Sequence, residues 1–232
     1  MVLIRDVINA IEEVIPPRYQ EDYDNTGLQA GTPLRPCTGV LLCVDVTPEI
    51  VVEAADKGCN LIVSHHPLIF HPLKSLSGEG RVEFSIYKAI KNDVSIYSCH
   101  TAVDNTPLTG VSWKMAEMLG LENVELLEDK GAGTGCGVVG NLPVSLTQLQ
   151  LVERVKNVFN APVARCSAYT PGQTEISRVA LCGGAGAFLL PEAIEKGAQA
   201  FITSDCKHNH FLDYARSIFL IDIGHFESEE CT

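Results

Sequence analysis

The sequence lacks long hydrophobic runs, an excess of basic residues and paired cysteine motifs. No run of about 18 apolar residues occurs, so nothing in it predicts a membrane-spanning helix. Lysine and arginine number 17 against 29 aspartates and glutamates, which gives a formal net charge of −12. Nucleic-acid backbones are bound by clusters of lysine and arginine, so this balance disfavours nucleic acid as a partner.

The cysteines also exclude certain kinds of site. None of the nine stands in a C-x-x-C pair, which disfavours a zinc ribbon or a thioredoxin-like site. Their number is odd, and apolar residues at helical spacing predict an amphipathic helix over residues 2–15 rather than a signal peptide. We therefore expect a reducing, cytoplasmic location.

What the sequence contains is enough apolar material for a well-packed α/β protein. Hydrophobic residues make up 46% of the 232 residues, and the mean hydropathy is +0.12. Strand-like runs at 39–46, 61–63 and 94–99 alternate with helix-like segments at 47–57 and 81–91. This alternation predicts mixed or mostly parallel sheets flanked by helices.

The second half of the chain repeats the first at a constant offset. V-L-L-C at 40–43 matches V-A-L-C at 179–182, and E-A-A-D-K-G at 53–58 matches E-A-I-E-K-G at 192–197, both displaced by 139 residues. We infer two related α/β lobes, 1–125 and 126–232. The second lobe is expected to begin with a glycine-rich linker at 131–140, followed by a helix at 145–159 and strands at 161–169 and 218–223.

The stretch N-L-I-V-S-H-H-P at 60–67 is the strongest candidate for a functional site. Its apolar run is typical of a strand buried on both faces, and Pro67 ends that strand. His65 and His66 therefore stand at the edge of a sheet, where open α/β folds place their sites. Successive strand side chains point to opposite faces, so both imidazoles reach one ion only if the backbone turns, and two adjacent ions are served more easily.

Further metal-ligand types follow the other predicted strands. His100 and His225 each end a strand, and each has a carboxylate four residues on, Asp104 and Glu229 respectively. In a helical turn His225 and Glu229 share one face. Imidazoles with carboxylates suit zinc, iron, manganese, nickel or cobalt without selecting among them. A pair of such ions activates water in many hydrolases.

Simpler explanations exist for several of these residues. A single histidine at a strand end is more often structural, and an isolated carboxylate there commonly stabilises a helix dipole. The glycines at 183–186 precede a helix, but their spacing fits no phosphate-binding loop, so tight strand–helix packing is favoured. Three histidines carry weaker signals because they lie in a loop or open a helix: His71, His208 and His210.

Seven motifs together resemble the Nif-three-like family, whose members are often labelled GTP cyclohydrolase one type two homologues. The resemblance covers nearly the whole chain in the short form of the family, without an inserted domain. The motifs are D-N-T-G-L-Q-A-G (24–31), V-D-V-T (44–47), S-H-H-P (64–67), H-T-A-V-D (100–104), C-G-G-A-G (182–186), I-T-S-D (202–205) and G-H-F-E-S-E (224–229).

The resemblance implies a two-lobed α/β protein that holds two divalent metal ions and assembles into a homohexameric ring. It places His100 and Asp205 as near neighbours of the ions, where either is able to shuttle a proton. The departures are at Ser204, where the family commonly has glycine, at His208-Asn209-His210, where it has an aspartate soon after a histidine, and in the glycine-rich segment, which lacks arginine. The ligands that it implies are His65, His66, Asp104, His225 and Glu229.

Two functions are consistent with these features. The first is a metal-dependent hydrolase acting on a nucleotide-like or phosphorylated small molecule, with a water between the ions as nucleophile. The second is a non-enzymatic metal-binding module with a regulatory or assembly role. The sequence does not identify the substrate or the native metal.

Overall fold

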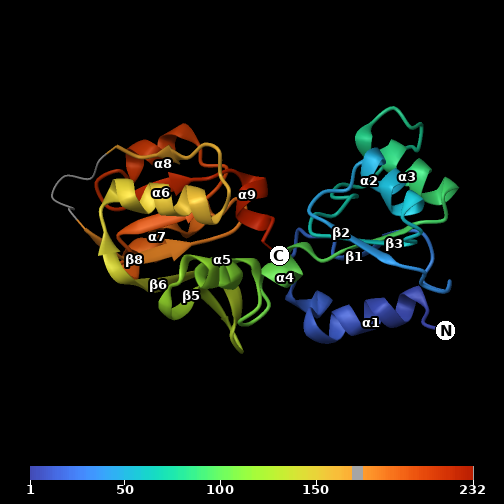
Figure 1. Cartoon of the computed structure of the whole chain (residues 1–232), viewed down its shortest axis with the longest axis horizontal. Helices are drawn as coiled ribbons and strands as arrows, with labels where there is room; N and C mark the ends of the chain where they lie inside the picture. The colour runs from blue at the N-terminus through green and yellow to red at the C-terminus, as the bar shows by residue number, and fades with distance from the viewer. Residues whose placement is uncertain (169–174, 232) are drawn as a thin grey trace. The chain divides into compact units, whose positions relative to one another are not determined.

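The computed structural model describes residues 1–168 and 175–231, and the chain divides into two compact units, Met1–Thr106 and Pro107–Thr232 (Figure 1). The first unit ends just after α4 (His100–Asp104). The boundary between the units therefore lies after Thr106. A boundary after residue 125, as expected from the sequence, would cut strand β5 (Glu122–Gly131). In the described part of the chain, no helix has both the length and the apolar character needed to span a bilayer.

The first unit is built on a four-stranded sheet in the order β1-β4-β3-β2. Its strands β2, β3 and β4 are parallel, and β1 pairs antiparallel with β4. The sheet is therefore mixed, as predicted. Its strands are β1 (Gly27–Ala30), β2 (Val40–Cys43), β3 (Leu61–Ser64) and β4 (Ser95–Ser98).

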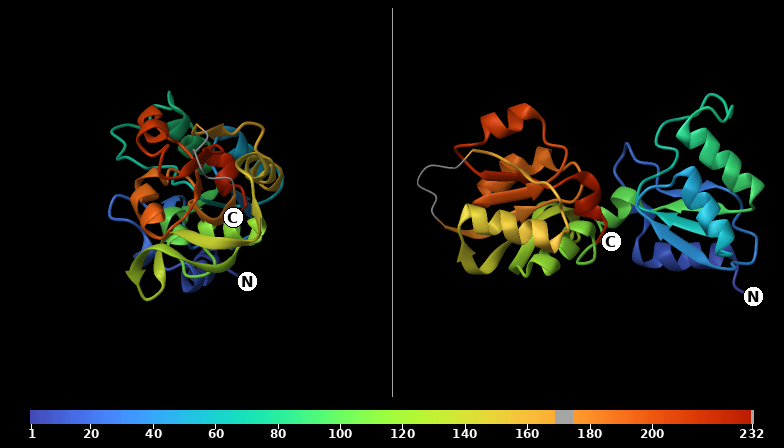
Figure 2. Two further views of the ribbon diagram at one scale, coloured as in Figure 1. Left: turned by 90° about the vertical axis from the view of Figure 1, so that its left-hand side faces the viewer. Right: turned by 45° about the horizontal axis from the view of Figure 1, so that its top comes forward.

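Helices cover both faces of this sheet (Figures 1 and 2). The amphipathic helix α1 (Ile4–Val14) packs on Leu61 and Tyr97. Side chains of α2 (Pro48–Asp56) and α3 (Arg81–Lys91) pack on Ile62 and Ile96, which point the opposite way because strand side chains alternate. The short helix η1 is Pro17–Tyr19. Burial of both faces explains the uninterrupted apolar run of β3.

The second unit contains a six-stranded sheet in the order β5-β6-β8-β9-β10-β7. Strands β8, β9 and β10 are parallel, while β5, β6 and β7 pair antiparallel with their neighbours. The remaining strands are β6 (Thr134–Leu146), β7 (Arg165–Cys166), β8 (Ile176–Leu181), β9 (Ala200–Thr203) and β10 (Phe219–Asp222).

The helices of the second unit lie on the two faces of its sheet (Figure 2). Helix α5 (Val111–Leu119) packs on β6 and on α6 (Gln148–Val158). Apolar residues of α7 (Leu190–Glu195) and α8 (His208–Asp213) join the core that contains Ala180, Phe201 and Leu220. The unit also contains η2 (Ala187–Leu189) and α9 (His225–Glu229).

Two expectations for the second unit were wrong in detail. The glycine-rich segment 131–140 is not a linker, because it forms the turn of the β5–β6 hairpin and the first half of β6. Its glycines permit close backbone approach, since a Cβ on Gly135 would collide with the carbonyl oxygen of Glu128. The strand expected at 161–169 is limited to the two residues of β7, and residue 169 lies outside the described residues.

The internal repeat is confirmed by the pairing register. In the first unit Val40 pairs with Leu61, and in the second Val179 pairs with Ala200, both parallel. Each of these four positions keeps the 139-residue displacement found in the sequence. The two units therefore share a β-α-β element with identical register, and their strand ends are equivalent positions.

Candidate functional site

The chain turns immediately after β3, and this turn places two imidazoles side by side in the first unit. The hydroxyls of Ser64 and Ser98 donate to the carbonyl oxygen of His66 at 2.8 and 3.2 Å. The amide of His100 donates to the carbonyl of His65 at 2.8 Å, which joins the ends of β3 and β4. The rings of His65 and His66 consequently lie 4.9 Å apart, despite the alternation expected in a straight strand.

Carboxylates lie beside both of these histidines. The Nε2 atom of His65, a residue only 7% exposed, is 4.0 Å from Oδ1 of Asp104 on α4. The Nδ1 atom of His66 is 3.1 Å from Oδ1 of Asp45. Asp104 was anticipated from the sequence, whereas Asp45 was not singled out there although it stands in the V-D-V-T motif.

The third imidazole of the first unit, His100, is held by a buried carboxylate. Its Nδ1 atom is 2.6 Å from Oδ1 of Asp24, whose side chain is completely buried. The other oxygen of Asp24 accepts from the amide and the hydroxyl of Thr101. Burial disfavours the charged form of Asp24, but the hydrogen bonds from His100 and Thr101 outweigh it and lower the pKa to about 2.

The backbone at His100 is also unusual. This residue has a φ of +35°, in the left-handed region that favours glycine. Its ring lies 5.7 Å from the ring of His65 and 5.5 Å from that of His66. The first unit thus gathers three imidazoles at the carboxyl ends of β3 and β4.

The second unit brings His225 and Glu229 together on α9, as their spacing predicted. Nε2 of His225 is 3.2 Å from Oε1 of Glu229, and the Glu229 side chain is 5% exposed. Nδ1 of His225 is 2.6 Å from Oδ2 of Asp205. The hydrogen bond with Glu229 is the main cause that raises the pKa of His225 to about 9; burial opposes it, and Asp205 adds to it.

The glycine loop before η2 supports this pair rather than forming a phosphate cradle. Gly184 has a φ of +62°, and a Cβ there would collide with Oε1 of Glu229 and lie 3.4 Å from Nε2 of His225. Its amide donates to Oγ of Ser228 at 2.9 Å, and that hydroxyl donates to the carbonyl of His225 at 2.8 Å. The sequence favoured close packing over phosphate binding for this loop, and the structure shows Gly184 packed closely against Glu229.

Three of the four histidines at the strand ends (His65, His66, His100 and His225) share one arrangement. In each of the three, a carboxylate lies at Nδ1 and fixes the orientation of the ring. Metal-binding histidines are commonly oriented in this way, so the side chains present fit a transition-metal ion. The pairs are His66 with Asp45, His100 with Asp24, and His225 with Asp205.

The weaker histidines take other roles. His71 lies beside the ring of Phe70 at 4.9 Å. Nδ1 of His210 accepts from the amide of Lys207 at 3.2 Å at the start of α8, and His208 is the first residue of that exposed helix. These contacts account for His71 and His210 as local packing and capping groups.

Comparisons with known proteins agree with this fold and these motifs. The GTP cyclohydrolase 1 type 2 homolog of Streptococcus pneumoniae is 34% identical over 229 residues, covering 97% of this chain and 85% of that protein. A crystal structure of a Staphylococcus aureus hypothetical protein superposes with a TM-score of 0.91 at 29% identity, over 97% of this chain and 87% of that one.

A Bacillus cereus protein described as related to NIF3 has the same fold, with a TM-score of 0.91 at 24% identity over 98% of this chain and 89% of that one. The family model described as Duf34/NIF3 (NGG1p interacting factor 3) matches residues 2–232. This chain belongs to the Duf34/NIF3 family.

Proposed function

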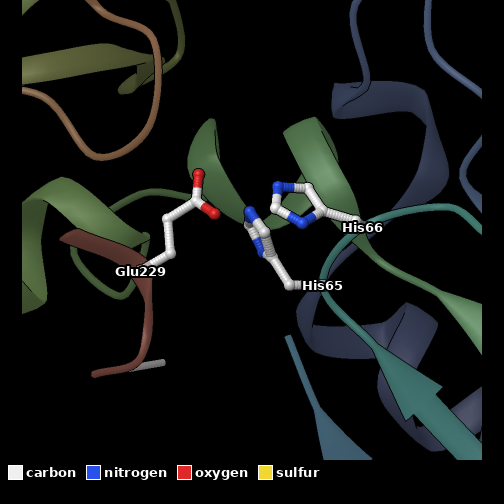
Figure 3. A group of neighbouring side chains, drawn as sticks. All are labelled: His65, His66 and Glu229. Atoms are coloured by element: carbon white, nitrogen blue, oxygen red, sulfur yellow. The ribbon is translucent and has the colours of Figure 1, made fainter. Parts of the chain in front are cut away.

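We propose that the protein is a metal-dependent hydrolase. The ligands in this proposal are His65, His66, Asp104, His225 and Glu229. Figure 3 draws His65 and His66, from the end of β3, with Glu229, from α9. The imidazole nitrogens and carboxylate oxygens of these three residues are donor types that hold a transition-metal ion.

The observation that carries this proposal is the orientation of the imidazoles by carboxylates. Asp45 and Asp205 lie at Nδ1 of His66 and His225, an arrangement that orients metal-binding imidazoles and leaves Nε2 as the nitrogen that a metal would take. Gly184 contributes by leaving room for the carboxylate of Glu229.

The neighbouring residues have separate roles in the proposed chemistry. Bound divalent cations would polarise a substrate oxygen and lower the pKa of water. His100, whose Nδ1 is fixed by Asp24, is the group that accepts a proton at Nε2. Asp205 positions His225 instead of transferring protons, because its carboxylate already lies at Nδ1 of that ring.

The substrate class in this proposal is a nucleotide-like or phosphorylated small molecule. It draws on the name of the relatives, GTP cyclohydrolase 1 type 2 homolog, and on the affinity of paired cations for phosphoryl oxygens. The assembly proposed with it is a cytoplasmic homohexamer. Light scattering on the eluted protein tests the assembly, since six copies of the 25.1 kDa chain are well separated from one or two.

The deciding experiment combines metal analysis with a hydrolysis screen. The purified protein, its His66→Ala variant and a His208→Ala control are assayed for metal content and for turnover of nucleotides, phosphoesters and cyclic amides. We expect metal and turnover in the parent and the control, and loss of both in His66→Ala. Turnover that survives complete metal removal would overturn the proposal. Full occupancy without turnover on any substrate would identify the metal-binding module instead.

A further inference from the structure

A cavity lies wholly within the second unit. Its volume is about 390 Å³, a size common among small-molecule sites, and it lies between the start of α5 and the β5–β6 hairpin. None of the described residues that line it is a proposed metal ligand. Those that matter for its chemistry are Pro107, Leu108, Trp113, Glu125, Asp129 and Lys196.

The wall supplied by α5 is aromatic. Trp113 is the single tryptophan of the sequence. Its indole nitrogen is buried and has no hydrogen-bond partner among the described residues. A buried indole N–H normally donates to something, because leaving it unpaired is unfavourable. Because this nitrogen has almost no accessible surface, a molecule in the cavity does not reach it, and Trp113 contributes to the cavity as an apolar lining residue.

The rim is held in a strained conformation. Leu108 has a φ of +62°, which is rare for a residue with a branched side chain. The residue is 73% exposed, although it is apolar. A Cβ on Gly133 of the hairpin turn would lie 3.8 Å from Pro107, so the hairpin closes down on this segment. Strained positions of this kind concentrate where a protein contacts a ligand.

The polar groups are fixed and carry both signs. Oε1 of Glu125 accepts from Arg178 at 2.5 Å, and Oδ1 of Asp129 accepts from the amide of Gly131 at 2.8 Å. Nζ of Lys196 donates to the carbonyl of Leu126 at 2.7 Å. Each carboxylate has a second oxygen that is able to accept an N–H group of a ligand.

This combination selects against phosphate and in favour of a planar heterocycle. Two carboxylates repel an anion, and the single ammonium group already donates to a carbonyl oxygen. An indole face favours stacking of a flat ring. Carboxylate oxygens match the amino and ring N–H groups of such a ring.

We propose that this cavity binds an amino-substituted heterocycle of purine size, as the free base or the nucleoside. The ring stacks on Trp113, and its N–H edge faces Glu125 and Asp129. Binding here does not depend on the metal centre, so the two proposals stand or fall separately.

Trp113 supplies the readout as the only indole in the chain. Chelator-treated protein is titrated with guanosine and adenosine while tryptophan emission is recorded, and calorimetry provides an independent signal. We expect saturable quenching with at least one of the two. Purine riboside, which has the ring but no amino or oxo group, should bind at least tenfold more weakly.

Variants locate the site. Asp129→Asn should weaken nucleoside binding at least tenfold, whereas Asp213→Asn, a carboxylate on the surface of α8, should leave it unchanged. Calorimetry on Trp113→Phe should detect weakened binding without relying on the fluorophore. Absence of saturable binding by both signals in the parent protein, or equal binding by parent and Asp129→Asn, would overturn the proposal. Nucleoside binding by this protein, together with full metal occupancy and no turnover of any substrate, would retain this site and reject the hydrolase.

Discussion

The two units share one strand register but differ in the chemistry at their strand ends. His66 in the first unit is equivalent by the repeat to Asp205 in the second, and Asp45 is equivalent to Gly184. In the first unit a carboxylate from one strand end orients an imidazole from the next. In the second, the carboxylate occupies the imidazole position and orients His225 from a third strand. The repeat preserves the scaffold and exchanges the roles of the side chains.

The difference yields complementary groups. The first unit gathers three imidazoles with Asp104, whereas the second has one imidazole and a nearly buried glutamate. The comparison therefore indicates that duplication was followed by specialisation of each strand end.

Removal of a ligand from the second unit should have the largest effect. Glu229→Gln keeps the size of the side chain but removes its charge. We expect metal affinity to fall by roughly 100-fold or more, because losing a ligand should cost more than losing a residue that only hydrogen-bonds to a ligand. Competition with a chromophoric chelator measures the change. Metal affinity equal to that of the parent would show that the first unit alone holds the metal.

Loss of an orienting carboxylate should have a smaller effect. In Asp205→Asn the ring of His225 loses its anionic partner, and we expect metal affinity to fall by about 10- to 100-fold. The same chelator competition applies, with Asp213→Asn as the matched control. A change as large as that of Glu229→Gln would make Asp205 itself a ligand.

The buried aspartate of the first unit should affect stability in a pH-dependent way. The pKa of Asp24 is lowered to about 2 in the folded protein, so its ionised form stabilises the fold above the ordinary carboxyl range, and this contribution disappears as pH falls through about 2. Replacement by asparagine should cost about 2 kcal/mol near neutral pH.

Urea unfolding of the parent and Asp24→Asn, from pH 7 down to pH 2, measures this difference. The gap between the two proteins should narrow as the pH approaches 2, because the parent loses its charge. Asp22→Asn, at an exposed site nearby, should show no such gap. A gap independent of pH would assign the role of Asp24 to packing alone.

The smallest predicted effect tests the repeat itself. Gly58 and Gly197 are equivalent, each has a φ of +72°, and a Cβ added at either position would meet no atom within 4 Å beyond its chain neighbours. Alanine at either site should therefore cost only the backbone strain, about 1–2 kcal/mol. Urea unfolding of both variants should give the same loss, and clearly unequal losses would mean that the two turns are not equivalent.

Local patterns predicted the repeated elements well. The helix expected at 81–91 is α3, and Thr47 and Pro48 begin α2 through a side-chain cap and a proline at the first position. These signals lie within a few residues of the structure that they determine. By contrast, β6 contains Gly135 and Gly137, which resemble a linker in sequence but permit close packing against Glu128 and Leu127.

The candidate site was predictable in its histidines but not in two of their carboxylate partners. His65, His66, His100 and His225 follow strands, and this position is visible in the sequence. Asp24 is 76 residues from His100, and Asp45 is 21 residues from His66. Only the fold brings such residues together, so no spacing rule identifies them.

The support given to Glu229 by Gly184 has a consequence for engineering. A tandem of two first lobes would carry an aspartate at the position of Gly184. It would also lack α9, and with it Glu229. A tandem of two second lobes would lack the S-H-H-P turn, because Thr203, Ser204 and Asp205 occupy its place. Under the proposed ligand set, neither lobe is able to replace the other, and a minimal version of this protein must retain one of each.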